Sequence, residues 1–308
     1  MLTDLFIFIA ALFVVIKGAT LATKYAAKLA GNFNLSKYTV GFIIVAVISI
    51  LPETFIAISS AVNSVPSFGL GVLFGSNVAD LTLVFAIIVF LTGRSLKVES
   101  KILKNHDVYP FILLLPIILG LNGNFSRLEG LALIVTGSIF YYLALKNGKN
   151  EVKTSTGKKG RGKNFLMLFF SMAILLIGAQ FTVTSATSLA NYFDINPIII
   201  GMLIVGLGTT TPELFFSLRA MKKQDDSLAV GDILGTVLAD ATIVVGILAL
   251  IHPFSFPIKI VYIAGFFMVA ASFILFRFME SGRTLTKKEA RLLFIFWIFF
   301  VLVEFIAV

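Results

Sequence analysis

Long apolar runs alternate with short polar connections along the whole chain of 308 residues. The hydrocarbon core of a bilayer is about 30 Å thick, so a helix needs about 20 apolar residues to cross it. On this basis the sequence predicts an all-α polytopic membrane protein with ten transmembrane helices. The predicted spans are residues 3–23, 38–62, 70–92, 108–121, 127–145, 164–190, 196–218, 228–252, 257–276 and 291–308.

The composition supports a membrane protein and excludes several kinds of functional site. Hydrophobic residues make up 58% of the chain and charged residues 13%, whereas soluble domains average about 45–50% and 25%. There is no cysteine, which excludes disulfide scaffolds and thiolate metal sites. The two histidines, His106 and His252, lie at predicted span ends and are too few for a histidine-built metal or catalytic centre. We therefore do not expect an enzyme or a prosthetic group.

The basic residues indicate how the chain is oriented in the membrane. Of the 25 lysines and arginines, 22 fall on the connections after spans one, three, five, seven and nine, if Arg291 at the start of the tenth span is counted with the last of them. Cytoplasmic loops of membrane proteins concentrate these residues. We therefore predict a plasma-membrane protein with both termini outside and the basic loops in the cytoplasm. The positive charge then reflects topology and contact with anionic lipid rather than nucleic-acid binding, and no obligatory protein partner is implied.

The two halves of the chain repeat one another at a constant offset. "GFIIVAVISILPETF" (41–55) recurs as "GMLIVGLGTTTPELF" (201–215), and "GVLFGSNVADLTLV" (71–84) recurs as "GDILGTVLADATIV" (231–244), each 160 positions later. We predict a first five-helix repeat over 1–145, a basic cytoplasmic linker over 146–163 and a second repeat over 164–308. Five spans per repeat is an odd number, so the second repeat enters the membrane inverted, as in many secondary transporters whose binding site lies between repeats.

Acidic residues deep within the predicted spans are the main candidates for function. A carboxylate in the hydrocarbon region is costly and usually marks an ion path. Four such residues occur at repeat-related positions with no basic residue near them in sequence: Glu53, Asp80, Glu213 and Asp240. They therefore call for cations. Asp232 and Glu304 lie nearer to span ends, and we expect them at the membrane interface.

Other oxygen donors accompany these carboxylates. Each is preceded, four residues earlier and so on the same helix face, by a hydroxyl group: Ser49, Ser76, Thr209 and Thr236. Pro52 and Pro212 have no N–H to donate to the carbonyl groups four residues earlier, which frees backbone oxygens beside each glutamate. Carboxylate, hydroxyl and carbonyl oxygens suit Ca²⁺ or Na⁺ rather than Zn²⁺ or Cu²⁺.

These motifs resemble the two α-repeats of the Ca²⁺/cation antiporter superfamily. "ISILPE", "GTTTPE", "GSNVAD" and "GTVLAD" are most similar to the motifs of prokaryotic Na⁺/Ca²⁺ exchangers. The resemblance implies an antiporter that extrudes Ca²⁺ in exchange for Na⁺ by alternating access. The ion ligands that it implies are the carboxylates of Glu53, Glu213, Asp80 and Asp240, the hydroxyls of Ser49, Ser76, Thr209, Thr210 and Thr236, and the backbone carbonyls of Ala46 and Gly206.

Two positions depart from the family pattern. Ile50 has no hydroxyl where its repeat partner Thr210 has one, so we expect a flanking monovalent site to be weakened. Asp80 stands where asparagine is common, so we expect one of the four carboxylates to hold a proton or a second cation. An H⁺-coupled exchanger of Ca²⁺ or another divalent cation is therefore the alternative. An uncoupled cation channel is less favoured, because channels usually assemble acidic rings by oligomerisation.

Overall fold

The computed structural model describes residues 2–30, 39–98, 108–147 and 161–307. Each of the ten predicted spans contains a helical stretch within these ranges. Elements of the first half are α1 (Leu2–Ala30), η1 (Val40–Val45), α3 (Ala46–Ser49), α4 (Leu51–Val62), α5 (Pro66–Ala79), η2 (Asp80–Val84), α6 (Phe85–Thr92), β1 (Leu96–Lys97), α7 (Tyr109–Leu119), η4 (Gly120–Asn122), β2 (Asn124–Phe125) and α8 (Arg127–Asn147). Elements of the second half are α9 (Arg161–Phe193), α10 (Pro197–Ile200), η5 (Gly201–Val205), α11 (Gly206–Thr209), α12 (Thr211–Lys222), α13 (Asp226–Ala239), η6 (Asp240–Val244), α14 (Val245–Ile251), β3 (Phe254–Ser255), α15 (Ile258–Glu280), η7 (Ser281–Arg283), β4 (Thr284–Leu285) and α16 (Lys287–Ala307).

Most of these helical stretches are long enough to cross a bilayer. Within the described residues, seven meet the requirements of length and hydropathy, and an eighth does if the stretch from Gly41 to Val62, bent by 42° at Ile50, is one span. The shorter apolar helix Tyr109–Asn122 and the 21-residue α16 correspond to the remaining predicted spans. Residues 148–160 of the predicted linker lie outside the described residues, so the domain boundaries stay a prediction.

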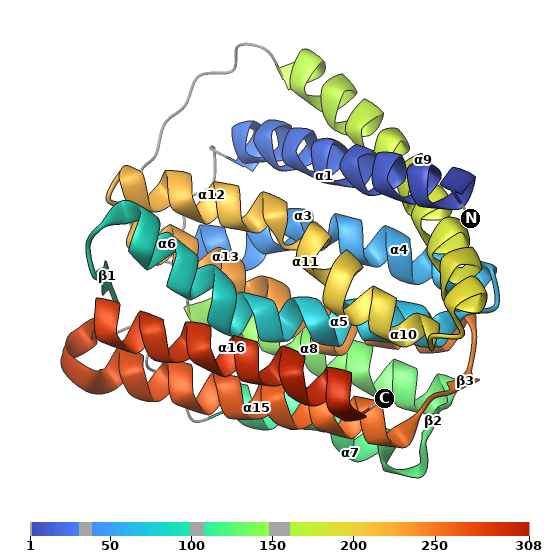
Figure 1. The fold of residues 1–308 in the computed structure, drawn as a ribbon. Helices are drawn as coiled ribbons and strands as arrows, with labels where there is room; N and C mark the ends of the chain where they lie inside the picture. The colour runs from blue at the N-terminus through green and yellow to red at the C-terminus, as the bar shows by residue number, and fades with distance from the viewer. Residues whose placement is uncertain (1, 31–38, 99–107, 148–160, 308) are drawn as a thin grey trace.

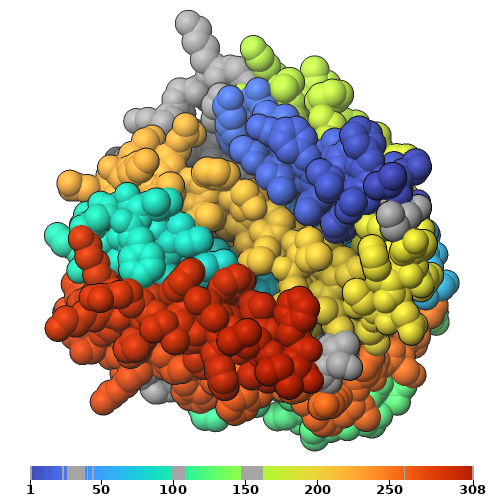
Figure 2. Space-filling model, in the orientation of Figure 1, coloured from blue at the N-terminus to red at the C-terminus, as the bar shows by residue number. Residues whose placement is uncertain are grey.

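The spans that carry the repeated motifs form the centre of the bundle. In Pro66–Thr92 and Asp226–Ile251, 89% and 83% of the most apolar window is buried, against 22% in Arg127–Lys146. Figure 1 shows α1 and α9 along one edge, α15 and α16 along the opposite edge, and α5 and α10 to α12 between them. In Figure 2 α1, residues 197–222, α6 and α16 lie edge to edge, and these helices expose apolar side chains such as Phe6, Phe215 and Phe299. This surface suits contact with lipid.

Reciprocal contacts show that the two halves are related by a two-fold axis. Gly75 lies against Met202, and Gly235, 160 positions later, lies against Phe42, the repeat partner of Met202. At the outer edge, Gly18 of α1 contacts Ile174 and Leu175 of α9. The repeat-related contact joins Gly178 to Val14 and Val15, so later residues of one helix meet earlier residues of the other. Helices α1 and α9 are therefore antiparallel, and the predicted inverted repeat is confirmed.

The helices are interrupted at repeat-related positions. Ile50 separates α3 from α4, and Thr210 separates α11 from α12, each two residues before a proline. Wider π-helical turns begin at Asp80 and Asp240. Such turns are rare and occur frequently at functional sites. All four interruptions lie in or directly beside the motifs that contain the candidate carboxylates.

Two short antiparallel strand pairs join the halves at the ends of the bundle. Leu96 pairs with Leu285 between β1 and β4, and Phe125 pairs with Phe254 between β2 and β3. These two-residue strands were not predicted from the sequence. They do not change the all-α class of the fold, because each only ties two helix connections together.

We predict that Gly75→Ala lowers thermal stability in detergent by several degrees. A Cβ at this position would clash with the backbone of Met202, so a whole helix would have to move, and overpacking of this kind costs about 1–3 kcal/mol. Gly162→Ala is the matched control, since nothing lies within 4 Å of a Cβ there. Equal melting temperatures for the two variants would contradict the close approach of α5 and η5.

Candidate cation-binding site

The four predicted carboxylates are buried and lack hydrogen-bond partners. Glu53 is 1% exposed, and Asp80, Glu213 and Asp240 are each 0% exposed. Neither carboxylate oxygen of any of the four has a hydrogen-bond partner. Proline at the second position of α4 and of α12 places each glutamate in the first turn after the break, and each aspartate begins a π-helical turn. Eight acceptor oxygens therefore lie inside the bundle without a donor.

The structure brings these carboxylates from four elements to one region. Helix α4 packs on η6, η2 packs on α13, and α13 packs on α12. The charge of Glu213 interacts with those of Glu53, Asp80 and Asp240. In addition, Asp80 and Asp240 each interact with Glu53. The packing and the mutual electrostatic interaction place the four carboxylates in one region of the bundle, and their role as ion ligands stays a prediction.

The predicted hydroxyl ligands are buried in the same region, but most of them donate to protein oxygens. Ser76 donates to the Leu73 carbonyl at 3.1 Å, and Thr210 donates to the Leu207 carbonyl at 3.0 Å. Thr236 has no partner. Hydroxyl oxygens that donate a proton keep lone pairs, so these groups remain able to accept or to coordinate.

The two predicted carbonyl ligands take part in helical hydrogen bonds. The Ala46 carbonyl accepts from the Ile50 N–H at 2.9 Å. The Gly206 carbonyl accepts from the Thr210 N–H at 3.2 Å and from the Thr209 hydroxyl at 3.0 Å. Ion coordination by these carbonyls would have to share or replace those bonds, and their role as ligands stays a prediction.

Asp232 and Glu304, which were expected at the membrane interface, are buried inside the bundle. Both are 0% exposed. Ser49 donates to Asp232 Oδ1 at 2.8 Å, while Asp232 Oδ2 has no partner. Neither oxygen of Glu304 has a hydrogen-bond partner either. Distance from the end of an apolar run is a poor guide to the burial of Asp232 within the bundle, because η1 and α3 cover the first turns of α13.

The sequence did contain a signal for Asp232. Asp232, Thr236 and Asp240 are spaced four residues apart, so they lie along one face of α13. Glu213 and Asp80 both interact with the charge of Asp232. Asp232 therefore belongs to the same electrostatic cluster as the four predicted carboxylates.

The cluster is acidic, but its carboxylates alone do not form a complete coordination shell for a metal ion. Among the described residues, no three acidic or histidine side chains are close enough to hold a metal ion by themselves. Lys17, the basic residue within the apolar part of α1, is exposed and lies over the Phe13 ring. A cation at this cluster would therefore draw on hydroxyl and carbonyl oxygens as well as carboxylates.

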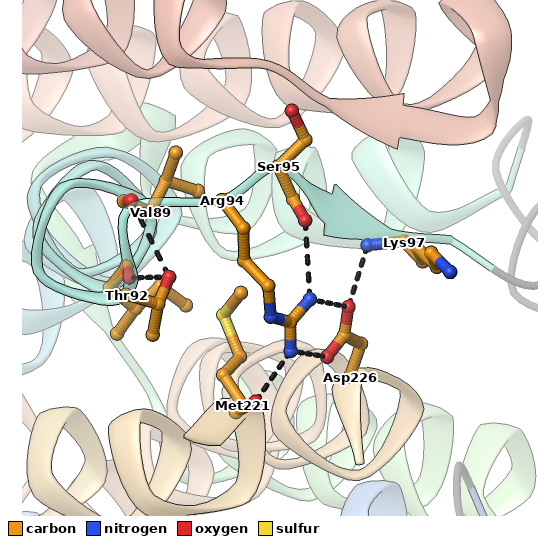
Figure 3. Close-up of polar contacts among 8 residues, drawn as sticks. Val89, Thr92, Arg94, Ser95, Lys97, Met221 and Asp226 are labelled. Carbon is orange, nitrogen blue, oxygen red and sulfur yellow. Dashed lines mark hydrogen bonds and ion pairs between the residues drawn. The ribbon is translucent and has the colours of Figure 1, made fainter. Parts of the chain in front are cut away.

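An ion pair joins the two halves at one end of the bundle (Figure 3). Both Arg94 Nη atoms bind the carboxylate of Asp226, at 2.7 and 2.5 Å, and Asp226 Oδ2 also accepts from the Lys97 N–H at 2.8 Å. Arg94 further donates to the Met221 carbonyl at the end of α12. The hydrogen bond and the charge of Asp226 raise the pKa of Arg94, so the guanidinium stays charged.

Comparison with known proteins adds a family match over nearly the whole chain. The family model described as "Sodium/calcium exchanger protein" matches residues 3–146 and 163–306. The sodium/calcium exchanger MaX1 of Methanosarcina acetivorans is 22% identical over 94% of this chain and 95% of its own. The inner membrane protein YrbG of Escherichia coli is 25% identical over 74% of each chain.

A solved structure is similar over almost the full length. The sodium-calcium exchanger NCX_Mj, soaked with Na⁺ and Sr²⁺, has a TM-score of 0.72 and 22% identity, covering 97% of both chains. At this identity the likeness shows the fold, which is the fold predicted from the sequence.

We predict that Arg94→Ala destabilises the protein by about 2 kcal/mol, because it leaves the 7%-exposed Asp226 carboxylate with only its backbone donor. Arg277→Ala is the control, since Arg277 is 83% exposed and its contact with Glu280 is 3.6 Å. Thermal unfolding in detergent measures both variants. Equal losses of stability would show that the Arg94 pair does not hold the two halves together.

Proposed function

The chain belongs to the sodium/calcium exchanger protein family, and on that premise we propose that it exchanges Ca²⁺ for Na⁺ and extrudes Ca²⁺ from the cytoplasm. Membership of this family makes it a multi-pass membrane transporter of cations and not an enzyme. The identity of the transported ions, the direction of transport and the roles of individual residues are the parts that we propose.

The observation that carries the proposal is the set of buried carboxylates without hydrogen-bond partners: Glu53, Asp80, Glu213 and Asp240. A charged carboxylate at the centre of a bilayer costs at least about 2.5 kcal/mol. Bound cations offset this cost, whereas an empty cluster bears all of it. The switch between the conformations that open to the two sides of the membrane is therefore disfavoured when the cluster is empty. It requires that one ion or the other is bound. This requirement produces exchange rather than leak.

Ca²⁺ and Na⁺ both suit the donor set. Ca²⁺ takes six to eight oxygen ligands in flexible geometry, and the cluster offers carboxylate, hydroxyl and backbone oxygens. Glu53 and Glu213, which lie on symmetry-related helices, would provide the central ligands, with Asp80 and Asp240 beside them. The inverted repeat supports alternating access, because two packings related by the two-fold axis expose one site to opposite sides.

A second candidate function, H⁺-coupled exchange, is favoured by one observation. Ile50 is 8% exposed at the break between α3 and α4, where the symmetry-related Thr210 places a hydroxyl. One half of the cluster therefore has one oxygen fewer for a monovalent ion. Asp80 adds a carboxylate that a proton could neutralise instead of Na⁺.

The proposed location is the plasma membrane, with the basic connections on the cytoplasmic side. Arg94, Lys97, Lys222 and Lys223 lie on such connections. The end of the bundle that carries the Arg94–Asp226 pair is then the cytoplasmic end. Because the chain has no cysteine, single introduced cysteines and an impermeant maleimide can test this orientation directly.

We predict that the purified protein in vesicles takes up ⁴⁵Ca²⁺ when Na⁺ is loaded inside, and that Glu213→Gln lowers this uptake at least about 100-fold. The variant keeps the shape of the side chain and removes a charge that the bound Ca²⁺ needs. A parallel series loads the vesicles with protons instead of Na⁺ at matched voltage.

Two other outcomes of this experiment would decide against Na⁺ exchange, and a third would decide against the role of the carboxylates. Uptake driven only by protons would replace Na⁺ with H⁺ as the counter-ion. Uptake that needs neither gradient would indicate a channel. Unaltered transport by Glu213→Gln would show that transport does not depend on the carboxylate cluster.

We predict that Ile50→Thr lowers the Na⁺ concentration for half-maximal exchange severalfold, because it restores the oxygen that Thr210 provides in the other half. The Ca²⁺ concentration for half-maximal uptake should stay within about twofold of that of the unaltered protein, since Ca²⁺ already has the four carboxylates. Ile56→Thr, on the buried face of α4, controls for the effect of a new hydroxyl elsewhere on the same span. An equal effect of both substitutions would contradict the assignment.

A further inference from the structure

A second polar group lies beside the four-carboxylate cluster and is formed by Ser49, Ser217 and Asp232. Their side chains are 1%, 0% and 0% exposed. Ser49 of α3 donates to Asp232 Oδ1 at 2.8 Å. The Ser217 hydroxyl of α12 donates to the Ala229 carbonyl at 3.5 Å, three residues before Asp232 on α13, and lies close enough to the Asp232 carboxylate to interact with it. Asp232 Oδ2 has no partner although no solvent reaches it. The carboxylate is thus buried with half of its acceptor capacity unused.

All three residues lie between the central cluster and the end of the bundle that carries Arg94. Asp232 is about 9 Å along α13 from Asp226, and Asp240 is about 21 Å along, at 1.5 Å per residue. Ser217 follows Glu213 by one turn, toward the Met221 carbonyl that Arg94 contacts. On the other side, η1 enters against the start of α13, where Gly41 meets Leu228.

The symmetry-related position, toward the opposite end, has no such group. The residues 160 positions away from Ser49, Ser217 and Asp232 are Thr209, Ala57 and Val72. Ala57 and Val72 are fully buried, and the Thr209 hydroxyl donates to the Gly206 carbonyl. The two-fold axis therefore relates a group with a carboxylate on one side of the cluster to a group on the other side with one hydroxyl and no carboxylate.

We propose that Ser49, Ser217 and Asp232 form a cation subsite through which the transported ion passes only between the central cluster and the end that carries Arg94. This subsite rests on the proposed antiport function. A carboxylate and two hydroxyls form a hard oxygen site, so its ligand is the transported Ca²⁺ or Na⁺. An ion leaving the four carboxylates toward this end keeps a charged partner, Asp232, about two helical turns from Asp240, whereas an ion leaving toward the other end does not.

The asymmetry has a measurable consequence. The subsite raises the local cation concentration on one side only, so the half-saturating Ca²⁺ concentration is lower at the Arg94 end than it would be without Asp232. At the opposite end Asp232 has no corresponding effect. A residue that merely holds α3 against α13 would instead affect both ends, through stability.

The test is Asp232→Asn, which keeps an oxygen able to accept the Ser49 hydrogen bond and removes the charge. ⁴⁵Ca²⁺ exchange is measured in inside-out and right-side-out vesicles, so that each face is titrated separately. Lys222→Cys, next to Met221 and exposed, identifies the Arg94 face by labelling with an impermeant maleimide. We expect the half-saturating Ca²⁺ concentration to rise about tenfold at that face and to change less than about twofold at the other.

Two further variants separate the subsite from a general effect of burial. Ser217→Ala removes a hydroxyl without removing charge, and we expect a smaller rise confined to the same face. Glu304→Gln is the matched control, because it neutralises another fully buried carboxylate without a hydrogen-bond partner, on α16. It should affect neither face selectively.

Each remaining outcome has a definite meaning. Equal changes at both faces, or no change at either, would overturn the subsite while leaving the antiport function in place, provided that the unaltered protein exchanges and Glu213→Gln does not. Failure of the unaltered protein to exchange would overturn the proposed function and the subsite together.

Discussion

Buried carboxylates that no donor among the described residues satisfies are the constraint on which the rest of the structure depends. Burial of a charge is tolerated only when something compensates it. Among the described residues this compensation is not seen at the cluster: the Arg94–Asp226 ion pair, which joins the two repeats, lies at the end of the bundle. A mobile cation is the remaining partner, and a protein that needs one cation or another in its centre is suited to exchange.

Close packing of backbones puts the carboxylates together. Glycines at repeat-related positions, such as Gly75 and Gly235, let α5 and α13 approach the broken helices of the opposite half. Those breaks and the π-helical turns at Asp80 and Asp240 then direct oxygens inward. The same contacts recur about the two-fold axis, so the scaffold is close to symmetric. The side chains beside the cluster are not symmetric, because Asp232 lies toward one end of the bundle and its repeat partner Val72 lies toward the other. In the proposed subsite this difference allows the two directions of transport to differ.

Much of this was predictable from the sequence, for specific reasons. The ten spans follow from hydrophobic length, and the inverted repeat follows from a constant offset between motifs and an odd number of spans. The four carboxylates were identifiable because an acidic residue in the middle of an apolar run is rare. The burial of Asp232 and Glu304 was not predictable, since the burial of a residue near the end of a span depends on which neighbouring helix covers that end. Contacts such as Arg94–Asp226, 132 positions apart, depend on packing that no local pattern encodes.

The most direct test of the central claim is equilibrium binding of ⁴⁵Ca²⁺ to the purified protein in detergent, with Na⁺ as competitor. Binding, unlike transport, does not depend on orientation or on a gradient. If the buried carboxylates hold the transported ion, the protein binds Ca²⁺ saturably, Na⁺ or H⁺ displaces it, and Glu53→Gln or Glu213→Gln abolishes it. Saturable binding that survives both substitutions would show that the cation is held elsewhere and that the cluster has another role.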